Sequence, residues 1–267
     1  MFDRNRKVAL LFGANQKLTP PNMVTEVTRV FAAPPCGQPW QIVLVNRSGA
    51  DALAAEINAS GGTAVSLKAD VVDPAQMERL AADFAALFTD GPPVLDTLVY
   101  ASGVVGKRLG IEDEPIAEAV RILHTKTIGF ELACKLFAKC MAGRNPGKPG
   151  GDIIFISSLA AGPQLPYGPL KADASYVAGS AGGEGLAGCA VGEFGRKYGV
   201  RCNVLAPGPT EGEMVQSMGA DLVTALRERT ILKRLPTPRD VAYQVWFWAG
   251  ELHSAETGQY LQMTCGL

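Results

Sequence analysis

The sequence predicts an α/β protein built on one doubly wound parallel sheet of about seven strands, with helices on both faces. Seven apolar runs of strand length alternate with six amphipathic stretches of helix length along the 267 residues. Most strand runs are continuously apolar, as expected when both faces of a sheet are covered. The strict alternation of the two kinds of element favours parallel pairing.

The elements follow one another at regular intervals. The expected strands are residues 7–12, 41–46, 64–69, 97–101, 152–157, 201–206 and 259–262. The expected helices are residues 22–31, 50–60, 75–88, 116–142, 176–198 and 239–249. Asp-Pro at 73–74 and Pro-Arg-Asp at 238–240 are helix-start signals, since Asp caps the first turn and Pro is tolerated in it.

The breaks between elements are short. Three Pro-rich or Gly-rich stretches, at 33–39, 91–93 and 144–151, have the length of surface loops rather than of linkers between domains. We therefore expect one domain over residues 1–267, with a nucleotide half at about 1–150 and an active-site half at about 151–267. An α/β fold often reaches this length as a single unit.

Charge and cysteine content exclude several classes of function. The net charge is −1 and the pI is about 6.2, so nothing steers the chain toward nucleic acid or an anionic membrane. Six scattered cysteines without a CxxC pair, together with two histidines, argue against a metal site. They predict reduced thiols and a cytoplasmic protein. The first apolar stretch, VALLFGA, is too short for a signal peptide core or a membrane span.

The segment from Tyr176 to Pro209 reads YVAGSAGGEGLAGCAVGEFGRKYGVRCNVLAPGP. It resembles the active-site helix, the following strand and the Pro-Gly turn of the short-chain dehydrogenases/reductases. The resemblance spans nearly the whole chain and is weakest in the first 40 residues. It implies a Rossmann-like fold and a nicotinamide-dependent oxidoreductase acting on a small molecule. The family helix opens Tyr-x-x-x-Lys, but here Ser180 stands at the Lys position.

The turn after the first strand departs from the family pattern. The family has Thr-Gly-x-x-x-Gly-x-Gly there, so that backbone N–H groups can approach a pyrophosphate. Residues 12–19 read FGANQKLT, which keeps Gly13 and places Lys17 and Thr19 at the other two glycines. Lys17 could offer a charge to phosphate. A rebuilt phosphate loop, with Gly13, Asn15 and Lys17 as contacts, and an eroded site remain equal alternatives.

The ends of the second and third strands favour a nucleotide. An acidic residue after the second strand would accept from a ribose 2′-hydroxyl, whereas an Arg suits a 2′-phosphate. Arg47 stands there with Ser48 beside it, and this pair favours NADP(H) over NAD(H). Asp70 and Val71 follow the third strand and match the adenine-contacting position of the family.

Two further turns match the nicotinamide end of the family site. Tyr-Ala-Ser-Gly after the fourth strand replaces the family's Asn-Asn-Ala-Gly, and Pro-Gly-Pro-Thr after the sixth matches the turn over the nicotinamide. The candidate cofactor contacts in these turns are Ala101, Gly103, Pro207, Gly208 and Thr210.

Tyr176 and Ser158 match the family's proton donor and carbonyl-orienting serine. They are separated by 18 residues here, against 13 usual in the family, which indicates an insertion within 159–175 over the substrate pocket. A literal Tyr-x-x-x-Lys at 167–171 is rejected as the active pair, because Pro169 would interrupt the helix. Asp173 is expected to cap the helix that carries Tyr176.

A second lysine could replace the missing one. The family's fourth helix carries Asn-x-x-Gly, and residues 126–129 read Lys-Thr-Ile-Gly, so Lys126 occupies the Asn position. Because Ser180 stands at the family's lysine position, that position carries no ammonium group. We hypothesise that Lys126 returns an ammonium to roughly the same point in space, where a cation favours the phenolate of Tyr176. The alternative is that Lys126 points to solvent, as most lysines do. Tyr176, Ser158, Lys126 and Ser180 are the candidate catalytic residues.

Three functions remain open at this point. The first is an atypical NADP(H)-dependent reductase of a carbonyl or iminium group, in a biosynthetic pathway like those of relatives that lack the Tyr/Lys pair. The second is a cofactor-independent cyclase, lyase or isomerase, favoured by the altered Gly-rich turn. The third is a non-catalytic partner subunit. The resemblance also implies a homo-dimer or homo-tetramer, and pocket walls from loops 104–115, 159–175 and 209–235.

Overall fold

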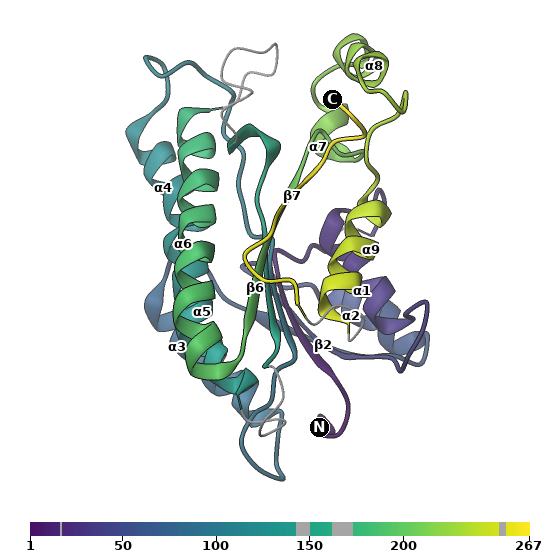
Figure 1. Ribbon diagram of the computed structural model, residues 1–267, viewed down its shortest axis with the longest axis vertical. Helices are drawn as coiled ribbons and strands as arrows, with labels where there is room; N and C mark the ends of the chain where they lie inside the picture. Colours follow the sequence, from purple (N-terminus) through teal and green to yellow (C-terminus); the bar gives the residue numbers. More distant parts are fainter. Residues whose placement is uncertain (17, 143–149, 162–172, 251–254) are drawn as a thin grey trace.

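The computed structural model describes residues 1–16, 18–142, 150–161, 173–250 and 255–267, and these form a seven-stranded parallel sheet (Figure 1). The strands are β1 (Val8–Phe12), β2 (Gln41–Asn46), β3 (Thr63–Lys68), β4 (Thr97–Tyr100), β5 (Asp152–Ile156), β6 (Arg201–Pro207) and β7 (Tyr260–Met263). Their order is β3-β2-β1-β4-β5-β6-β7, so the winding reverses between β1 and β4. The predicted fold class is confirmed, and each strand lies within a residue of its predicted place.

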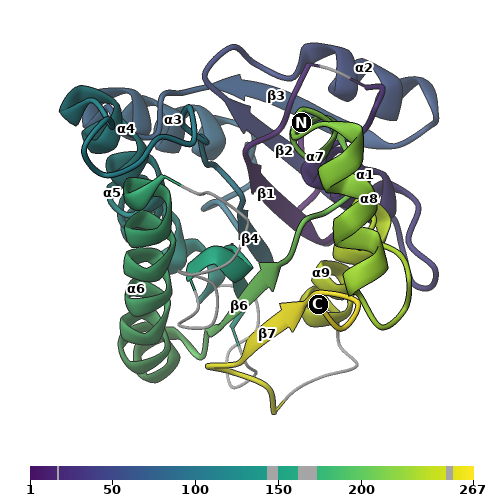
Figure 2. The ribbon, with the colours of Figure 1, turned by 90° about the horizontal axis from the view of Figure 1, so that it is seen from above.

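Helices cover both faces of this sheet. They are α1 (Met23–Ala32), α2 (Asp51–Ala59), α3 (Pro74–Ala86), α4 (Ile116–Lys126), α5 (Ile128–Phe137), α6 (Ala174–Tyr198), α7 (Glu213–Gln216), α8 (Ala220–Arg229) and α9 (Pro238–Ala249), with short 3-10 turns η1 (Ala138–Met141) and η2 (Leu159–Ala161). Seen from above, α3–α6 lie on one face and α1, α2 and α9 on the other (Figure 2). Asp73 and Thr237 cap α3 and α9 through their side chains, which explains both predicted helix starts.

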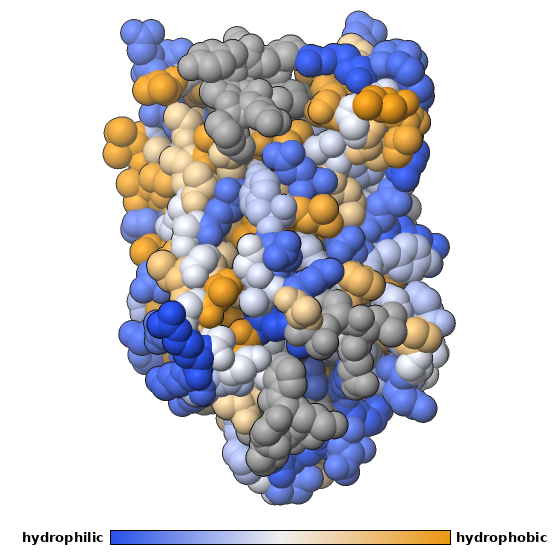
Figure 3. All heavy atoms as spheres, viewed as in Figure 1, coloured by the Kyte–Doolittle hydropathy of each residue, from blue (hydrophilic) through white to orange (hydrophobic). Residues whose placement is uncertain are grey.

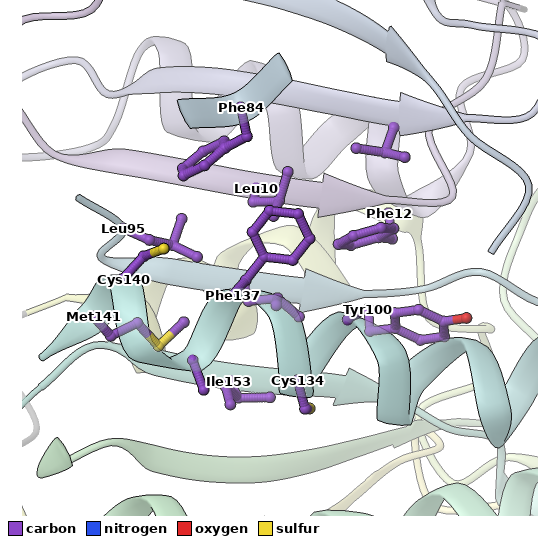
Figure 4. Packing of buried hydrophobic residues seen from close by; sticks show 14 of the residues in the cluster. Leu10, Phe12, Phe84, Leu95, Tyr100, Cys134, Phe137, Cys140, Met141 and Ile153 are labelled. Atoms are coloured by element: carbon purple, nitrogen blue, oxygen red, sulfur yellow. The ribbon is translucent and has the colours of Figure 1, made fainter. Parts of the chain in front are cut away.

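Alternate strand residues fill two cores, one on each face of the sheet. Leu10, Phe12 and Tyr100 face α3 and α5, where they pack with Phe84 and Phe137 (Figure 4). Ala9 and Leu11 point the other way, into the core beneath α1 and α9. Strands buried on both faces need continuous apolar runs, which is why the sequence shows them.

The predicted helix over 116–142 is wrong as a single element. It breaks at Thr127, where φ is −100° and ψ −71°, into α4, α5 and η1. The Tyr100 hydroxyl donates to the Thr125 carbonyl at 2.6 Å and so occupies a carbonyl at the end of α4. A Cβ on Gly129 would lie 2.2 Å from that hydroxyl, so the chain can pass Tyr100 only with glycine there. The break places Lys126 at the end of α4.

The predicted wall loop over 209–235 is also different in the structure, since it contains α7 and α8. Val215, Val223, Leu226 and Leu235 form a small core of their own there. These four apolar residues are spread over 21 positions and are too few to form the periodic pattern that predicts a helix.

Exposed apolar side chains include groups near α4 and after α8. On the face shown in Figure 3, apolar residues are seen at the upper left, over α4, and at the upper right, near α8. Ile116 and Val120 of α4, and Ile231 and Leu232 after α8, are exposed. Within the described residues, no helix combines the length and the apolar character needed to cross a bilayer.

Candidate active site

A cavity of about 840 Å³ opens beyond the carboxyl ends of β5 and β6. In a doubly wound sheet this is the edge at which ligands bind, because the crossover turns converge there. Its walls come from the segment between β4 and α4, the segment after β5, the first turn of α6, the segment after β6 and the stretch that precedes α1. The volume is in the range of small-molecule sites.

Ser158 and Tyr176 both line this cavity. Ser158 follows β5, and its Oγ accepts from the Ala160 amide at 3.2 Å, which turns the chain into η2. Tyr176 is in the first turn of α6 and is partly exposed to the cavity. The rejected pair at 167–171 lies outside the described residues, as does most of the proposed insertion.

Lys126 is buried, with 3% of its surface exposed. Its Nζ lies 4.6 Å from the centre of the Tyr176 ring, within the range of a cation–π contact. Two glycines leave room for its side chain, because a Cβ on Gly103 would lie 3.4 Å from Nζ and a Cβ on Gly179 3.3 Å from the lysine Cβ. The structure thus brings Lys126, Tyr176 and Gly103 together.

Ser180 lies one helical turn after Tyr176 and is completely buried. Its Oγ makes no hydrogen bond to any described residue. A buried hydroxyl without a partner costs free energy, so natural structures seldom keep one without a reason. A serine hydroxyl at this position cannot supply a positive charge to Tyr176.

Glu184, which the sequence analysis missed, lies a further turn along the same face of α6. Its carboxylate accepts a hydrogen bond of 2.5 Å from Ser157 Oγ. Burial raises the pKa of Glu184, while the Ser157 hydrogen bond, the charge of Lys126 and a hydrogen bond with Tyr260 oppose the rise. The spacing 176, 180, 184 was the signal that could have found it.

At the nucleotide end, Gly13 brings the turn after β1 against β4. Its φ is +91°, and a Cβ there would lie 2.8 Å from the Ala101 backbone. Asn15 lines the cavity. The Asn46 side chain donates to the Ala14 carbonyl, which fixes the turn to β2. Lys17 lies outside the described residues, so its proposed phosphate contact stays a prediction.

Arg47 and Asp70 meet beyond the ends of β2 and β3. Arg47 is 71% exposed, and its guanidinium lies 3.9 Å from the Asp70 carboxylate. Gln16, another residue that the sequence analysis missed, donates to the Ser48 carbonyl at 3.3 Å. The side chain of Val71 belongs to the core, so only its backbone can face a ligand.

The turn after β6 forms another wall of the cavity, to which Pro207, Gly208 and Thr210 contribute. The Gly208 amide donates to the Met263 carbonyl at 2.8 Å, and Thr210 Oγ1 donates to the Gly208 carbonyl at 3.0 Å. The carbonyl of Phe12 accepts from the Ala101 amide at 3.1 Å, so the ends of β1 and β4 stay together.

Asp173 does not cap α6 with its side chain, contrary to expectation. Its Oδ1 accepts from the Leu109 amide at 2.8 Å, so Asp173 holds the segment between β4 and α4 instead. Arg108 in that segment lines the cavity with a positive φ of 58°. Within the described residues no group of three His, Cys, Asp or Glu side chains could hold a metal ion.

Comparison with known proteins identifies the family. A family model described as enoyl-(acyl carrier protein) reductase matches residues 32–267. The chain belongs to the short-chain dehydrogenase/reductase family. Its relatives are named dehydrogenases and oxidoreductases, and this member of the short-chain family is an oxidoreductase.

Among the relatives is an L-rhamnose 1-dehydrogenase (NAD(P)(+)) of Azotobacter vinelandii, 30% identical over 88% of this chain and 90% of the relative. Another is a cis-4-hydroxycyclohexanecarboxylate dehydrogenase of Sinomonas cyclohexanicum, 27% identical over 82% of each. The solved structure of a 3-oxoacyl-[acyl-carrier protein] reductase from Brucella melitensis shares the fold at a TM-score of 0.81 and 21% identity, over 98% of this chain and 91% of that one.

Proposed function

We propose that this short-chain dehydrogenase/reductase uses NADP(H) and a rearranged proton relay to reduce a carbonyl or iminium group of a small molecule, or to catalyse the reverse oxidation. The observation that carries the proposal is the buried Lys126 ammonium against the ring of Tyr176. Lys126 would supply a positive charge beside the proton donor Tyr176, and the uncharged Ser180 cannot supply one.

The residues around the carboxyl ends of β1, β2 and β3 fit a dinucleotide. Gly13 allows a close backbone approach that no other residue permits there. Arg47 and Ser48 would hold a 2′-phosphate, and Asp70 would face the adenine. Asn15 and Ala101 would line the middle of the cleft. When bound, the nicotinamide supplies or accepts the hydride.

Gly103 and the turn at Pro207, Gly208 and Thr210 would frame the nicotinamide end, beside the cavity that holds Ser158 and Tyr176. In reduction, the Ser158 hydroxyl would donate a hydrogen bond to the substrate oxygen and so orient it. The Tyr176 hydroxyl would then donate its proton to that oxygen, and the Lys126 charge would stabilise the phenolate left behind. An iminium substrate needs no such proton and would depend less on Tyr176.

The proposal includes a homo-dimer or homo-tetramer. Ile116 and Val120 of α4 are exposed. On α6, a Cβ at Gly185 or Gly188 would meet nothing within 4 Å, so the outer face of this helix admits a close neighbour. Sedimentation velocity tests this: a monomer at micromolar concentration would contradict it.

Titration of the protein with NADPH and with NADH, followed by fluorescence or calorimetry, tests the cofactor. We expect NADPH to bind more tightly, and Arg47→Ala to weaken NADPH binding about tenfold or more without changing NADH binding. Arg79→Ala, which removes an exposed Arg from α3, is the matched control. If neither dinucleotide binds, the proposal is wrong, and a cofactor-independent cyclase, lyase or isomerase becomes the better explanation.

A further inference from the structure

Three charged side chains line the cavity among the described residues: Arg108, Glu211 and Glu213. The two carboxylates already have partners. Arg227 holds Glu211 with Nη2 at 2.8 and 3.0 Å from its two oxygens and Nε at 3.0 Å. Glu213 makes a polar contact of its own. Arg108 is therefore the charged side chain of this cavity that keeps hydrogen-bond donors for a ligand.

The Arg108 guanidinium makes one hydrogen bond within the described part of the chain, from Nη2 to the Met214 carbonyl at 3.2 Å. A guanidinium carries five N–H donors in a planar fork and no acceptor. This contact joins the two walls of the cavity, since Arg108 precedes α4 and Met214 belongs to α7. Most of the fork remains available to a ligand.

The backbone at Arg108 is arranged for this position. Its φ of 58° lies in the left-handed region, which is unfavourable for a residue with a side chain. Asp173, 1% exposed, holds this conformation through the Leu109 amide. Gly106 allows the segment before α4 to lie close to Asp173, because a Cβ there would lie 2.8 Å from Asp173 Oδ2. Strain held by buried contacts in this way occurs mainly at functional sites.

Apolar side chains line much of the same cavity as Arg108. They include Val105, Leu109, Ile111, Leu159, Met214 and Met218. A cation among apolar side chains favours a ligand that combines one anionic group with a hydrocarbon body.

We propose that Arg108 binds the carboxylate of a small substrate whose remaining body is apolar, and so orients its ketone or alcohol carbon toward Tyr176. The orientation toward Tyr176 rests on the proposed function, whereas the carboxylate site does not. Arginine suits this role because it can meet both carboxylate oxygens at once.

The experiment compares three probes of one shape: cyclohexanecarboxylate, cyclohexanecarboxamide and cyclohexylammonium. Calorimetry with the wild-type protein should show that the carboxylate binds roughly 10- to 100-fold more tightly than the amide. Arg108→Gln should abolish this preference and leave amide binding unchanged. Arg108→Lys should keep part of it, since the charge remains without the fork. Lys107→Gln, at the exposed neighbouring residue, is the matched control and should change nothing.

Turnover of 4-oxocyclohexanecarboxylate against its amide separates the two proposals. If the carboxylate binds through Arg108 but neither ketone is reduced, the proposed function is wrong and the carboxylate site stands. If both ketones are reduced equally well, the function stands and the carboxylate site is overturned. Equal binding of acid and amide, no binding of either, tighter binding of the ammonium, or equal weakening of acid and amide by Arg108→Gln would also overturn it.

Discussion

The Lys126 ammonium lies 4.6 Å from the centre of the Tyr176 ring, although the two residues belong to different helices. The helix break at Thr127 ends α4 at Lys126, and the long lysine side chain then reaches across to α6. The proposed relay therefore takes its positive charge from α4, next to the helix that carries Tyr176.

Replacement of Lys126 should therefore impair catalysis rather than folding. We expect Lys126→Met to lower kcat about 100-fold or more, because the phenolate of Tyr176 loses its neighbouring cation. Lys126→Arg should retain part of the activity. Lys135→Met removes an exposed lysine from α5 and serves as the control. Full turnover by Lys126→Met, measured with any reducible substrate, would show that the lysine has no catalytic part.

A lysine placed on α6 should restore part of the activity that is lost when Lys126 is replaced. Lys126→Ala opens space between α4 and α6, and Ser180→Lys in that background places an ammonium one turn from Tyr176. We expect this double variant to recover at least about tenfold in kcat over Lys126→Ala. Ser180→Met in the same background fills the same volume without charge and should not recover. Equal rates for the two double variants would contradict a charge-based role.

The pH dependence of stability should reveal the raised pKa of Glu184. Below pH 4.5 both the folded and the unfolded state hold this proton, and the group costs nothing. As the pH rises past 4.5 the unfolded carboxyl ionises while the folded one keeps its proton, so its contribution to stability falls until the folded pKa is passed. Glu184→Gln can still accept the hydrogen bond from Ser157 but has no carboxyl group to ionise. Its stability therefore does not fall in this way over this pH range.

The Tm of Glu184→Gln should therefore rise relative to wild type between pH 4 and pH 8, by a few degrees at most. Glu193→Gln, at an exposed position of the same helix, should show a constant difference. A constant difference for Glu184→Gln as well would mean that the carboxyl ionises in the folded state as it does in water.

The sheet could be predicted because its strands are buried on both faces and read as unbroken apolar runs. The break at Thr127 could not, because it depends on the hydroxyl of Tyr100, which is distant in sequence from Gly129. The hydrophobic periodicity of the sequence continues through such a break, so it does not show where one helix ends and the next begins. The Asn-x-x-Gly pattern of the family, by contrast, led to the hypothesis that Lys126 lies beside Tyr176, and the lysine is buried against that ring.

Positions beside the cavity could be predicted where a motif exists and not elsewhere. Tyr176 and Ser158 came from the family pattern, and both line the cavity. Glu184 and Arg108 match no motif, and their surroundings depend on tertiary contacts with Ser157 and Met214. Asp173 does stand at the N-cap position of α6, but its side chain accepts from the Leu109 amide, 64 residues away, and this contact could not be predicted.

The contact between Gly129 and Tyr100 gives a test of the helix break. Gly129→Ala should destabilise the protein by about 1–3 kcal/mol, because the new Cβ meets the buried Tyr100 hydroxyl. Gly185→Ala, on α6 with open space around it, should instead stabilise by about 0.5–1 kcal/mol. Tyr100→Phe combined with Gly129→Ala should recover part of the loss in urea unfolding. Strict additivity of the two changes would contradict the contact.

The ion pair between Asp152 and Arg201 joins the first residues of β5 and β6, and removing one partner alone should be costly. Two hydrogen bonds of 2.8 Å connect the side chains, which are 4% and 13% exposed. Asp152→Asn leaves the Arg201 charge buried without its counter-ion, and we expect a cost of about 3–5 kcal/mol in the free energy of unfolding. Asp221→Asn, an exposed change on α8, should cost less than about 0.5 kcal/mol.

Replacing both partners should cost less than removing Asp152 alone, because no isolated charge then remains in the interior. Urea unfolding of Asp152→Leu with Arg201→Leu, compared with each single variant, measures this directly. If the double variant is less stable than Asp152→Leu, the isolated Arg201 charge carries no such penalty, and the expected order is reversed.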